Sequence, residues 1–385
     1  MNILVIMVEF RKIGLFILAL LAVMALSACG QIDDDLSDCL PPEPPEPEKE
    51  LELDYELKLV TNMTTELQTQ LNTITDVEIS DALKADLSSV FRDFAHDVDL
   101  SFYDTQLDSV RLHHESHIMD DNQSSYTLNL PMREYMHLAS ANIANNSTVS
   151  LLDDEHCHKA HFFQIESDTI NSHETGLFTA RAYMKVLGDV NQTFNVRLYM
   201  ANAASSLVVD TTGVRYKSFR AYARGFAIDF QMSDSAYVFA ENSPYVRARE
   251  LPVSSELHQV GFCTVSFPSR NPDGWWMREK SDSTPNSATV GKNSRKTAIT
   301  RAEGEIIPEG ESSGEPLWEY VAFVTLEDGK VTKTTLTIKE PLLAGELKII
   351  NARMDTKGEV IPTDVSVGCS VTLDWTPGVN IETEL

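Results

Sequence analysis

The sequence predicts an all-β protein made of antiparallel β-sandwiches, with one helical insertion. Residues 51–59 place leucine or tyrosine at every second position and charged residues between them, which is the period-2 pattern of a half-buried strand. Further short alternating segments follow, separated by turn-prone residues, and this spacing is typical of β-sandwiches. A helix is predicted over residues 80–95, where Ser80 and Asp81 suit the first turn and the apolar stripe consists of Leu83, Leu87, Val90, Phe91 and Phe94.

The alternating segments fall into two groups, which predict two domains. The first group is expected to form strands around residues 98–102, 110–112, 126–130, 135–143 and 149–152. The second group is expected to form strands around residues 178–186, 194–200, 207–209, 219–223, 226–230, 260–262, 318–326, 336–338, 347–349 and 365–375. Because residues 165–176 are polar, we expect an N-terminal β-sandwich domain over residues 51–172 and a C-terminal one over residues 173–385.

The chain begins with a pattern typical of a bacterial lipoprotein signal peptide. Arg11 and Lys12 precede an apolar run over residues 13–26, which is too short to span a bilayer comfortably. The run leads through small residues into Cys29 and resembles a lipobox, so residues 1–28 are predicted to be removed by cleavage between Ala28 and Cys29. Cys29 would then carry lipid, and each buried CH₂ of an acyl chain contributes about 0.8 kcal/mol to membrane binding. The alternative is an ordinary secretory signal in which Cys29 has no role.

Residues 29–50 are expected to form a tether between the lipid and the first domain. The segment is rich in proline and acidic residues, and such a composition stays extended and solvated. Gln31 followed by Asp33, Asp34 and Asp35 resembles the export signal of Bacteroides-type surface lipoproteins. The predicted location is therefore the outer membrane, with the protein lipid-anchored and facing the cell surface.

The composition limits the classes of partner. A net charge of −27 repels nucleic acid and anionic lipid head groups, so we expect no nucleic-acid partner. A hydrophobic content of 42% is enough for packed cores. The sequence contains no second long apolar run, so lipid is the only anchor that it predicts.

Four cysteines follow Cys29, and they leave the disulfide pattern open. Cys39, Cys157, Cys263 and Cys369 allow three pairings, and export makes disulfides chemically possible. One alternative is a bond from Cys39 in the tether to Cys157 in the first domain. The other is that the cysteines are free, with Cys369 buried as a small apolar residue.

Residues 267–315 interrupt the strand pattern with a long loop. Between Arg270 and Arg301 this loop carries a net charge of +4, in contrast to the acidic remainder of the chain. Trp275 and Trp276 lie inside the basic segment. A loop of this length is usually functional or mobile. It is therefore either a contact surface for an acidic partner or a solvated insertion.

Chemical motifs are largely missing from the sequence. Histidines cluster at residues 113–117 and 156–161, but neither cluster has a known metal-ligand spacing, and neighbouring side chains on a strand point to opposite faces. We expect these histidines to be surface turn residues and predict no metal site. The chain also lacks a nucleophile elbow, a P-loop and a dinucleotide glycine pattern. We therefore expect no catalytic residues, no cofactor besides the lipid on Cys29, and no enzymatic activity.

Taken with the lipobox, several segments resemble the fimbrillin-A-associated anchor family of Bacteroides-type fimbriae. The resemblance rests on residues 34–39, the proline-rich gap, the first alternating strand, and the segments 178–186, 341–347 and 367–377. It implies two tandem transthyretin-like β-sandwich domains. It also implies an outer-membrane lipoprotein that attaches a fimbria, limits its length and binds the fimbrial shaft subunits.

The distribution of arginine favours an anchor over a shaft subunit. The resemblance implies that shaft fimbrillins lose their first strand to an arginine-specific protease. No arginine lies between Cys29 and Phe91, so such a protease cannot cut ahead of the strand at residues 51–59. The first strand is therefore predicted to stay joined to the lipid.

Two other functional classes stay open. One is a surface lipoprotein that binds glycan or peptide, with Trp275 and Trp276 stacking on a sugar. The other is an enzyme such as a glycosidase, which would need a pair of carboxylates about 5–10 Å apart in a cleft.

Overall fold

The structure is a computed structural model that describes residues 49–60, 71, 74, 76–91, 96–106, 109–118, 125–144, 146–152, 154–188, 192–254, 256, 258–272, 287–290, 297–298, 317–363 and 367–372. The chain falls into two units, Met1–Lys49 and Glu50–Leu385, and every element below belongs to the second unit.

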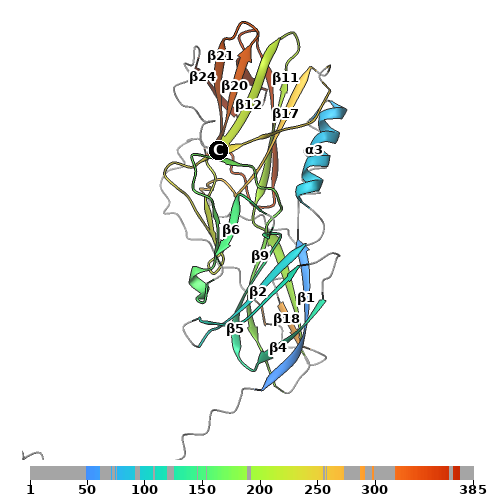
Figure 1. Ribbon diagram of the computed structural model, residues 1–385, viewed down its shortest axis with the longest axis vertical. Helices are drawn as coiled ribbons and strands as arrows, with labels where there is room; N and C mark the ends of the chain where they lie inside the picture. Colours follow the sequence, from blue (N-terminus) through green and yellow to red (C-terminus); the bar gives the residue numbers. More distant parts are fainter. Residues whose placement is uncertain are drawn as a thin grey trace, which may run out of the picture. The chain divides into compact units, whose positions relative to one another are not determined.

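The first sandwich is one sheet of nine strands, whose two halves are joined where the end of β10 pairs with the start of β9 (Figure 1). One half contains β4, β1 and β10, and the other contains β3, β2, β5 and β9. Inward side chains of both halves fill a single core, which includes Tyr55, Phe102, Leu128, Ala180 and Phe194. The strands are β1 (Glu50–Val60), β2 (Asp97–Asp104), β3 (Arg111–Ile118), β4 (Ser125–Pro131), β5 (Glu134–Ala141), β9 (Phe178–Lys185), β10 (Gln192–Met200), β18 (Ser287–Val290) and β19 (Thr297–Ala298).

The second sandwich consists of two sheets around a second core, in which Phe219, Phe226, Phe262, Trp318 and Tyr320 are the largest buried side chains. One sheet has the order β16-β17-β11-β22-β23, and the other has the order β24-β21-β20-β12-β15-β8. Their strands are β8 (Thr169–Asn171), β11 (Ala203–Asp210), β12 (Tyr216–Arg224), β15 (Tyr245–Arg247), β16 (Arg249–Glu250), β17 (Gln259–Ser266), β20 (Trp318–Leu326), β21 (Val331–Ile338), β22 (Leu347–Met354), β23 (Val360–Pro362) and β24 (Val367–Thr372).

A four-stranded sheet with the order β14-β13-β7-β6 covers the outer side of β2 and β5, where Tyr103, Met136 and Leu138 join its core. Its strands are β6 (Val149–Leu152), β7 (His161–Gln164), β13 (Asp229–Gln231) and β14 (Ala236–Val238), with the 3₁₀ turn η2 (Cys157–Lys159) between β6 and β7. The predicted all-β class with tandem sandwiches is confirmed. The sheets are not purely antiparallel, because β1 pairs with β10, β11 with β22 and β15 with β8 in parallel.

The predicted helix is α3 (Val77–Val90), which begins and ends earlier than the expected 80–95. Asp76 is the N-cap in place of Ser80 or Asp81, and its carboxylate accepts hydrogen bonds from the backbone N–H groups of Glu78 and Ile79. The buried stripe is Ile79, Leu83, Leu87 and Val90, at helical spacing. This stripe packs against β17, so the helix covers a sheet of the second sandwich (Figure 1).

The predicted domain boundary between residues 172 and 173 is wrong. β9 pairs with β5 along its whole length, and β10 pairs with β1, so residues 178–200 complete the first sandwich. Alternation along a strand shows which side chains are buried, but it does not show which strand lies beside it.

The interruption at 267–315 is not a loop throughout. Phe267 is fully buried, Ser269 forms a bridge with Phe226, and β18 pairs with residues 192–195 of β10. Trp275, Trp276 and most of the basic segment lie outside the described residues. The predicted final strand over 365–375 is described as β24, and Trp375 lies outside the described residues.

A half-buried arginine links α3 to the second sandwich. Arg249 donates to both carboxylate oxygens of Asp86 on α3, at 3.2 and 2.9 Å, and to Ser172 Oγ and the His173 carbonyl, at 3.1 and 3.0 Å. Burial acts to lower the pKa of Arg249, but the combined effects of Asp86 and Cys263 outweigh burial, so the pKa is raised.

Replacing Asp86 with asparagine is expected to lower the free energy of unfolding by about 1–2 kcal/mol, because the half-buried guanidinium loses its charged partner. Urea denaturation measures this change. Asp81→Asn on the exposed side of the same helix is the matched control and is expected to leave stability within about 0.5 kcal/mol. Equal effects of the two substitutions would contradict this role of Arg249.

Candidate functional site

The first strand, β1, is enclosed by two neighbours. Residues 50–56 pair with β4 in antiparallel register, and residues 54–60 pair with β10 in parallel register. Leu53, Tyr55 and Leu57 point into the core and are 2%, 0% and 6% exposed. The residues between them, Glu52, Asp54 and Glu56, are exposed, as the period-2 pattern predicts. β1 is therefore an integral strand of the sandwich.

A buried hydrogen-bond chain connects β1 to the opposite half of the sandwich. Tyr55 Oη lies 2.7 Å from His137 Nε2, and His137 Nδ1 lies 2.9 Å from the Ser101 carbonyl oxygen. A carbonyl can only accept, so Nδ1 carries the proton and Nε2 accepts from the tyrosine hydroxyl. The imidazole also stacks on Phe102, with ring centroids 4.2 Å apart. These hydrogen bonds fix the position of β1 between its neighbours, because a shift of one residue would separate the Tyr55 hydroxyl from His137 Nε2 and leave both unpaired.

Burial makes both members of the pair neutral. It lowers the pKa of His137 to about 4, with a smaller opposing effect from the Ser101 carbonyl, and it raises the pKa of Tyr55 well above its usual value. A charge on either ring is disfavoured because the core does not solvate it.

Stability is expected to fall as the pH decreases from about 6.5 to about 4. The unfolded chain binds a proton at the ordinary histidine pKa of about 6.5, whereas folded His137 stays neutral until about 4, so acid favours unfolding by about 3 kcal/mol. Buried His173 acts in the same direction, because its pKa is lowered to about 3. Urea denaturation at pH 7 and pH 4.5 measures the loss. The pH dependence should shrink in His137→Gln and persist in the exposed control His258→Gln; the reverse result would contradict the assignment.

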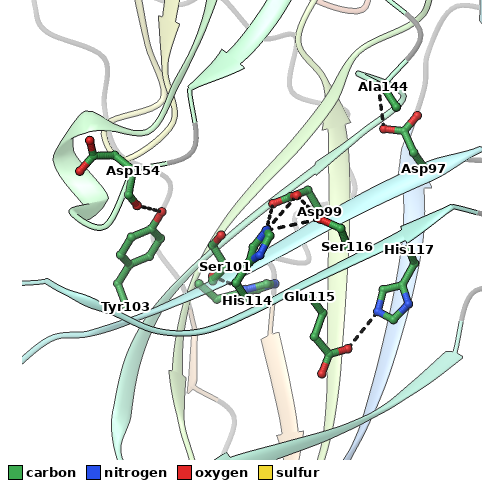
Figure 2. Close-up of polar contacts among 11 residues, drawn as sticks. Asp97, Asp99, Ser101, Tyr103, His114, Glu115, Ser116, His117, Ala144 and Asp154 are labelled. Atoms are coloured by element: carbon green, nitrogen blue, oxygen red, sulfur yellow. Dashed lines mark hydrogen bonds and ion pairs between the residues drawn. The ribbon is translucent and has the colours of Figure 1, made fainter.

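The histidines at 113–117 lie on β3, at the edge of the sheet, and not in a turn. His113 Nε2 and His117 Nε2 lie 2.7 and 2.9 Å from the two carboxylate oxygens of Glu115. On the opposite face, His114 Nε2 lies 2.9 Å from Asp99 of β2. Figure 2 shows the His117–Glu115 and His114–Asp99 contacts on the two faces of this strand. The expectation that neighbouring side chains diverge is confirmed.

One of these faces brings together the residue types of a serine hydrolase, but in a different arrangement. Ser116 Oγ donates to Asp99 at 2.6 Å, and the same carboxylate faces His114 Nε2 (Figure 2). In a catalytic triad the imidazole lies between serine and carboxylate and uses a different nitrogen for each. Here both Ser116 and Asp99 contact the same nitrogen, His114 Nε2, and Ser116 Oγ lies 3.4 Å from it. The imidazole therefore cannot relay a proton from one to the other.

Within the described part of the chain, no three His, Cys, Asp or Glu side chains are placed to bind a metal ion together. The second histidine cluster surrounds η2, where the rings of His156 and His158 stack with centroids 5.7 Å apart. His161 follows on β7 and lies 3.6 Å from Asp229.

The predicted lipidation and export residues, Ala28, Cys29, Gln31, Asp33, Asp34 and Asp35, lie outside the described residues. Among the described residues, no helix has both the length and the hydropathy needed to cross a membrane.

Cys39 also lies outside the described residues, whereas Cys157 is a free thiol that is 4% exposed. The Cys157 side chain packs in the core beneath the four-stranded sheet, and the Cys39–Cys157 bond stays a prediction. Cys369, expected to be buried, is exposed on β24.

The sequence did not predict the Tyr55–His137 hydrogen bond or the Asp86–Arg249 ion pair. The partners are separated by 82 and 163 residues, so spacing offered no signal for either pair. The weak clue was a histidine at residue 137, within an expected strand whose other residues are mostly apolar.

No family model matches the chain, and no curated protein matches it either. Several solved structures are similar at low identity. A candidate adhesin from Bacteroides ovatus ATCC 8483 is 13% identical, with a TM-score of 0.48, over 87% of this chain and 98% of that chain. The fimbrial anchor protein Mfa2 from Porphyromonas gingivalis is 9% identical, with a TM-score of 0.40, over 84% and 99%. The tip fimbrial protein Mfa3 from the same organism, truncated at its C-terminus, is 11% identical, with a TM-score of 0.36, over 86% and 100%. With TM-scores below 0.5, these likenesses assign neither a family nor a function to the chain.

Proposed function

We propose that the chain is the base subunit of a cell-surface fimbria, held on the outer membrane by lipid on Cys29. It attaches the shaft and limits its length. The observation that carries this proposal is the position of β1, which follows the acidic tether directly and is enclosed between β4 and β10. A subunit whose first strand is built in keeps its folded body joined to its lipid.

The distribution of arginine supports a base subunit over a shaft subunit. The first arginine after Cys29 is Arg92, which follows both β1 and α3. An arginine-specific protease that acts ahead of β1 therefore has no site. The groove between β4 and β10 stays filled by the chain's own strand and is closed to a strand from a neighbour.

The shaft would then attach at a sheet edge. Among the described strands, β3 and β24 each end the order of their sheet. An edge strand offers free backbone N–H and C=O groups to an incoming strand, and such pairing is a common form of subunit contact.

Cross-linking on intact cells, followed by identification of the co-purifying proteins, tests the function. We expect fimbrial shaft subunits in the cross-linked fraction. We also expect cells that lack the protein to release longer fimbriae into the medium. Recovery of glycan or unrelated surface proteins, with fimbriae unchanged in length and attachment, would contradict the proposal.

Surface exposure is expected to depend on the acidic cluster of the tether. Replacing Asp33, Asp34 and Asp35 with alanine should leave lipidation intact and trap the protein on the periplasmic side of the outer membrane. Protease shaving of whole cells measures exposure. Replacing Glu43, Glu46 and Glu48 removes the same charge from the same tether and is the matched control. Equal shaving of both variants and the wild type would overturn the export role.

A further inference from the structure

The direction of β1 relative to β10 has a mechanical consequence. The two strands are parallel, with Asp54 opposite Thr193 and Val60 opposite Tyr199. The tether enters β1 at Glu50, so any pull from the tether acts on the N-terminal end of β1. The C-terminal end of β10 lies at the opposite end of the pair.

That opposite end leads directly into the second sandwich. β10 ends at Met200 and β11 begins at Ala203. Of the two residues between them, Asn202 is fully buried and holds the crossing in place. Its side-chain oxygen accepts from Leu177 N at 3.2 Å, its amide donates to the Thr175 carbonyl at 2.9 Å, and its carbonyl accepts from Gly345 N at 2.8 Å.

We infer that β1 is a mechanical clamp, which transmits tension between the tether and the second sandwich through the shearing of its pairing with β10. This function rests on the proposed lipid anchor, since the tether is under tension only when its far end is held. A load on the second sandwich pulls β10 at its C-terminal end, while the tether pulls β1 at its N-terminal end. The two parallel strands are thus pulled in opposite directions along their common axis.

The pairing of β1 with β10 resists shear because its hydrogen bonds share the load. Hydrogen bonds between strands run roughly across the strand direction. Sliding β1 along β10 therefore stretches all the bonds over residues 54–60 together, whereas peeling the strand from one end would break them one at a time. Sliding must also draw Leu53, Tyr55 and Leu57 out of the core and break the Tyr55–His137 hydrogen bond.

Single-molecule force spectroscopy on the purified, unlipidated protein tests the clamp by pulling in two geometries. In both, one handle is at the N-terminal end of the tether. For shear, the second handle is at Glu327→Cys, an exposed position in the turn at the far end of β20. For peeling, it is at Met132→Cys, a 62% exposed position beside the end of β4 that pairs with Glu50. Cys29→Ser, Cys39→Ser and Cys369→Ser leave the handle as the accessible thiol, because Cys157 and Cys263 are buried.

We expect the first rupture in the shear geometry to need a force several times higher than in the peeling geometry at the same loading rate. The gain in length identifies the part that opens. In shear it is about 90 Å when residues 50–76 are released up to α3, and about 500 Å when residues 50–200 all unfold; in peeling it is about 270 Å when residues 50–131 unfold. Tyr55→Phe should lower the rupture force in shear. Tyr183→Phe, on the exposed side of β9, should leave it unchanged.

Equal forces in the two geometries, or a first event in shear that opens the second sandwich, would overturn the clamp. This outcome is independent of the lipid anchor, because the purified protein carries no lipid. Conversely, release from the membrane is measured on cells and does not depend on rupture force. The failure of the clamp and the failure of the lipid anchor would therefore show in different experiments.

Discussion

Replacing Cys29 with alanine is expected to move the protein from the outer-membrane fraction to the medium or the periplasm, together with any attached fimbriae. Lipid on Cys29 is the only anchor that the sequence predicts, and the acidic body with a net charge of −27 is repelled by anionic head groups. Two or three acyl chains hold a protein stably, whereas a protein with none has no comparable affinity for the bilayer. Immunoblotting of separated membrane, periplasmic and medium fractions measures the redistribution.

Cys39→Ala is the matched control, because it removes a cysteine from the same tether and leaves the lipobox intact. It is expected to keep the protein in the outer membrane at the wild-type level. Retention of the Cys29→Ala protein at that level would show that another segment holds the membrane, and the lipid-anchor proposal would be wrong.

Replacing Tyr55 with alanine is expected to lower the free energy of unfolding of the first sandwich by about 3–5 kcal/mol. The ring is fully buried, so its removal leaves a cavity in the core, and it also leaves His137 Nε2 without a donor. This is a large share of the roughly 5–15 kcal/mol that holds a domain folded. Urea denaturation followed by circular dichroism measures the change.

Two substitutions separate the packing effect from the hydrogen bond. Tyr55→Phe keeps the ring and loses the hydroxyl, and it is expected to cost about 1–3 kcal/mol. Tyr183→Ala removes a tyrosine that is 45% exposed on β9 and is expected to change stability by about 0.5 kcal/mol or less. If Tyr55→Ala were as mild as Tyr183→Ala, β1 would not be an integral strand.

The sequence predicted β1 well because one physical rule determines it. A strand with one face in the core must alternate, and residues 51–59 alternate without a break. The apolar stripe of α3 was predicted in the same way, because a helix with one buried face repeats its apolar residues at helical spacing. The predicted start of α3 was too late, because the N-cap Asp76 lies in a stretch without apolar periodicity.

The sequence pattern does not predict which distant strands pair with each other. β9 and β10 alternate as expected, yet nothing in their alternation shows that they join β5 and β1 and not the second sandwich. The same limit hid the Tyr55–His137 pair. A histidine in an apolar strand can pair with any polar group across the core, and the fold alone brings Tyr55 to it.

A base subunit of this kind keeps β1 and its lipid on one polypeptide in the mature protein. Intact-mass and peptide mass spectrometry of the protein extracted from the outer membrane tests this most directly. We predict a single chain that begins at lipid-modified Cys29 and contains the peptide of residues 50–58. A mature chain that begins beyond Val60, with no residues from the tether or β1, would contradict the account.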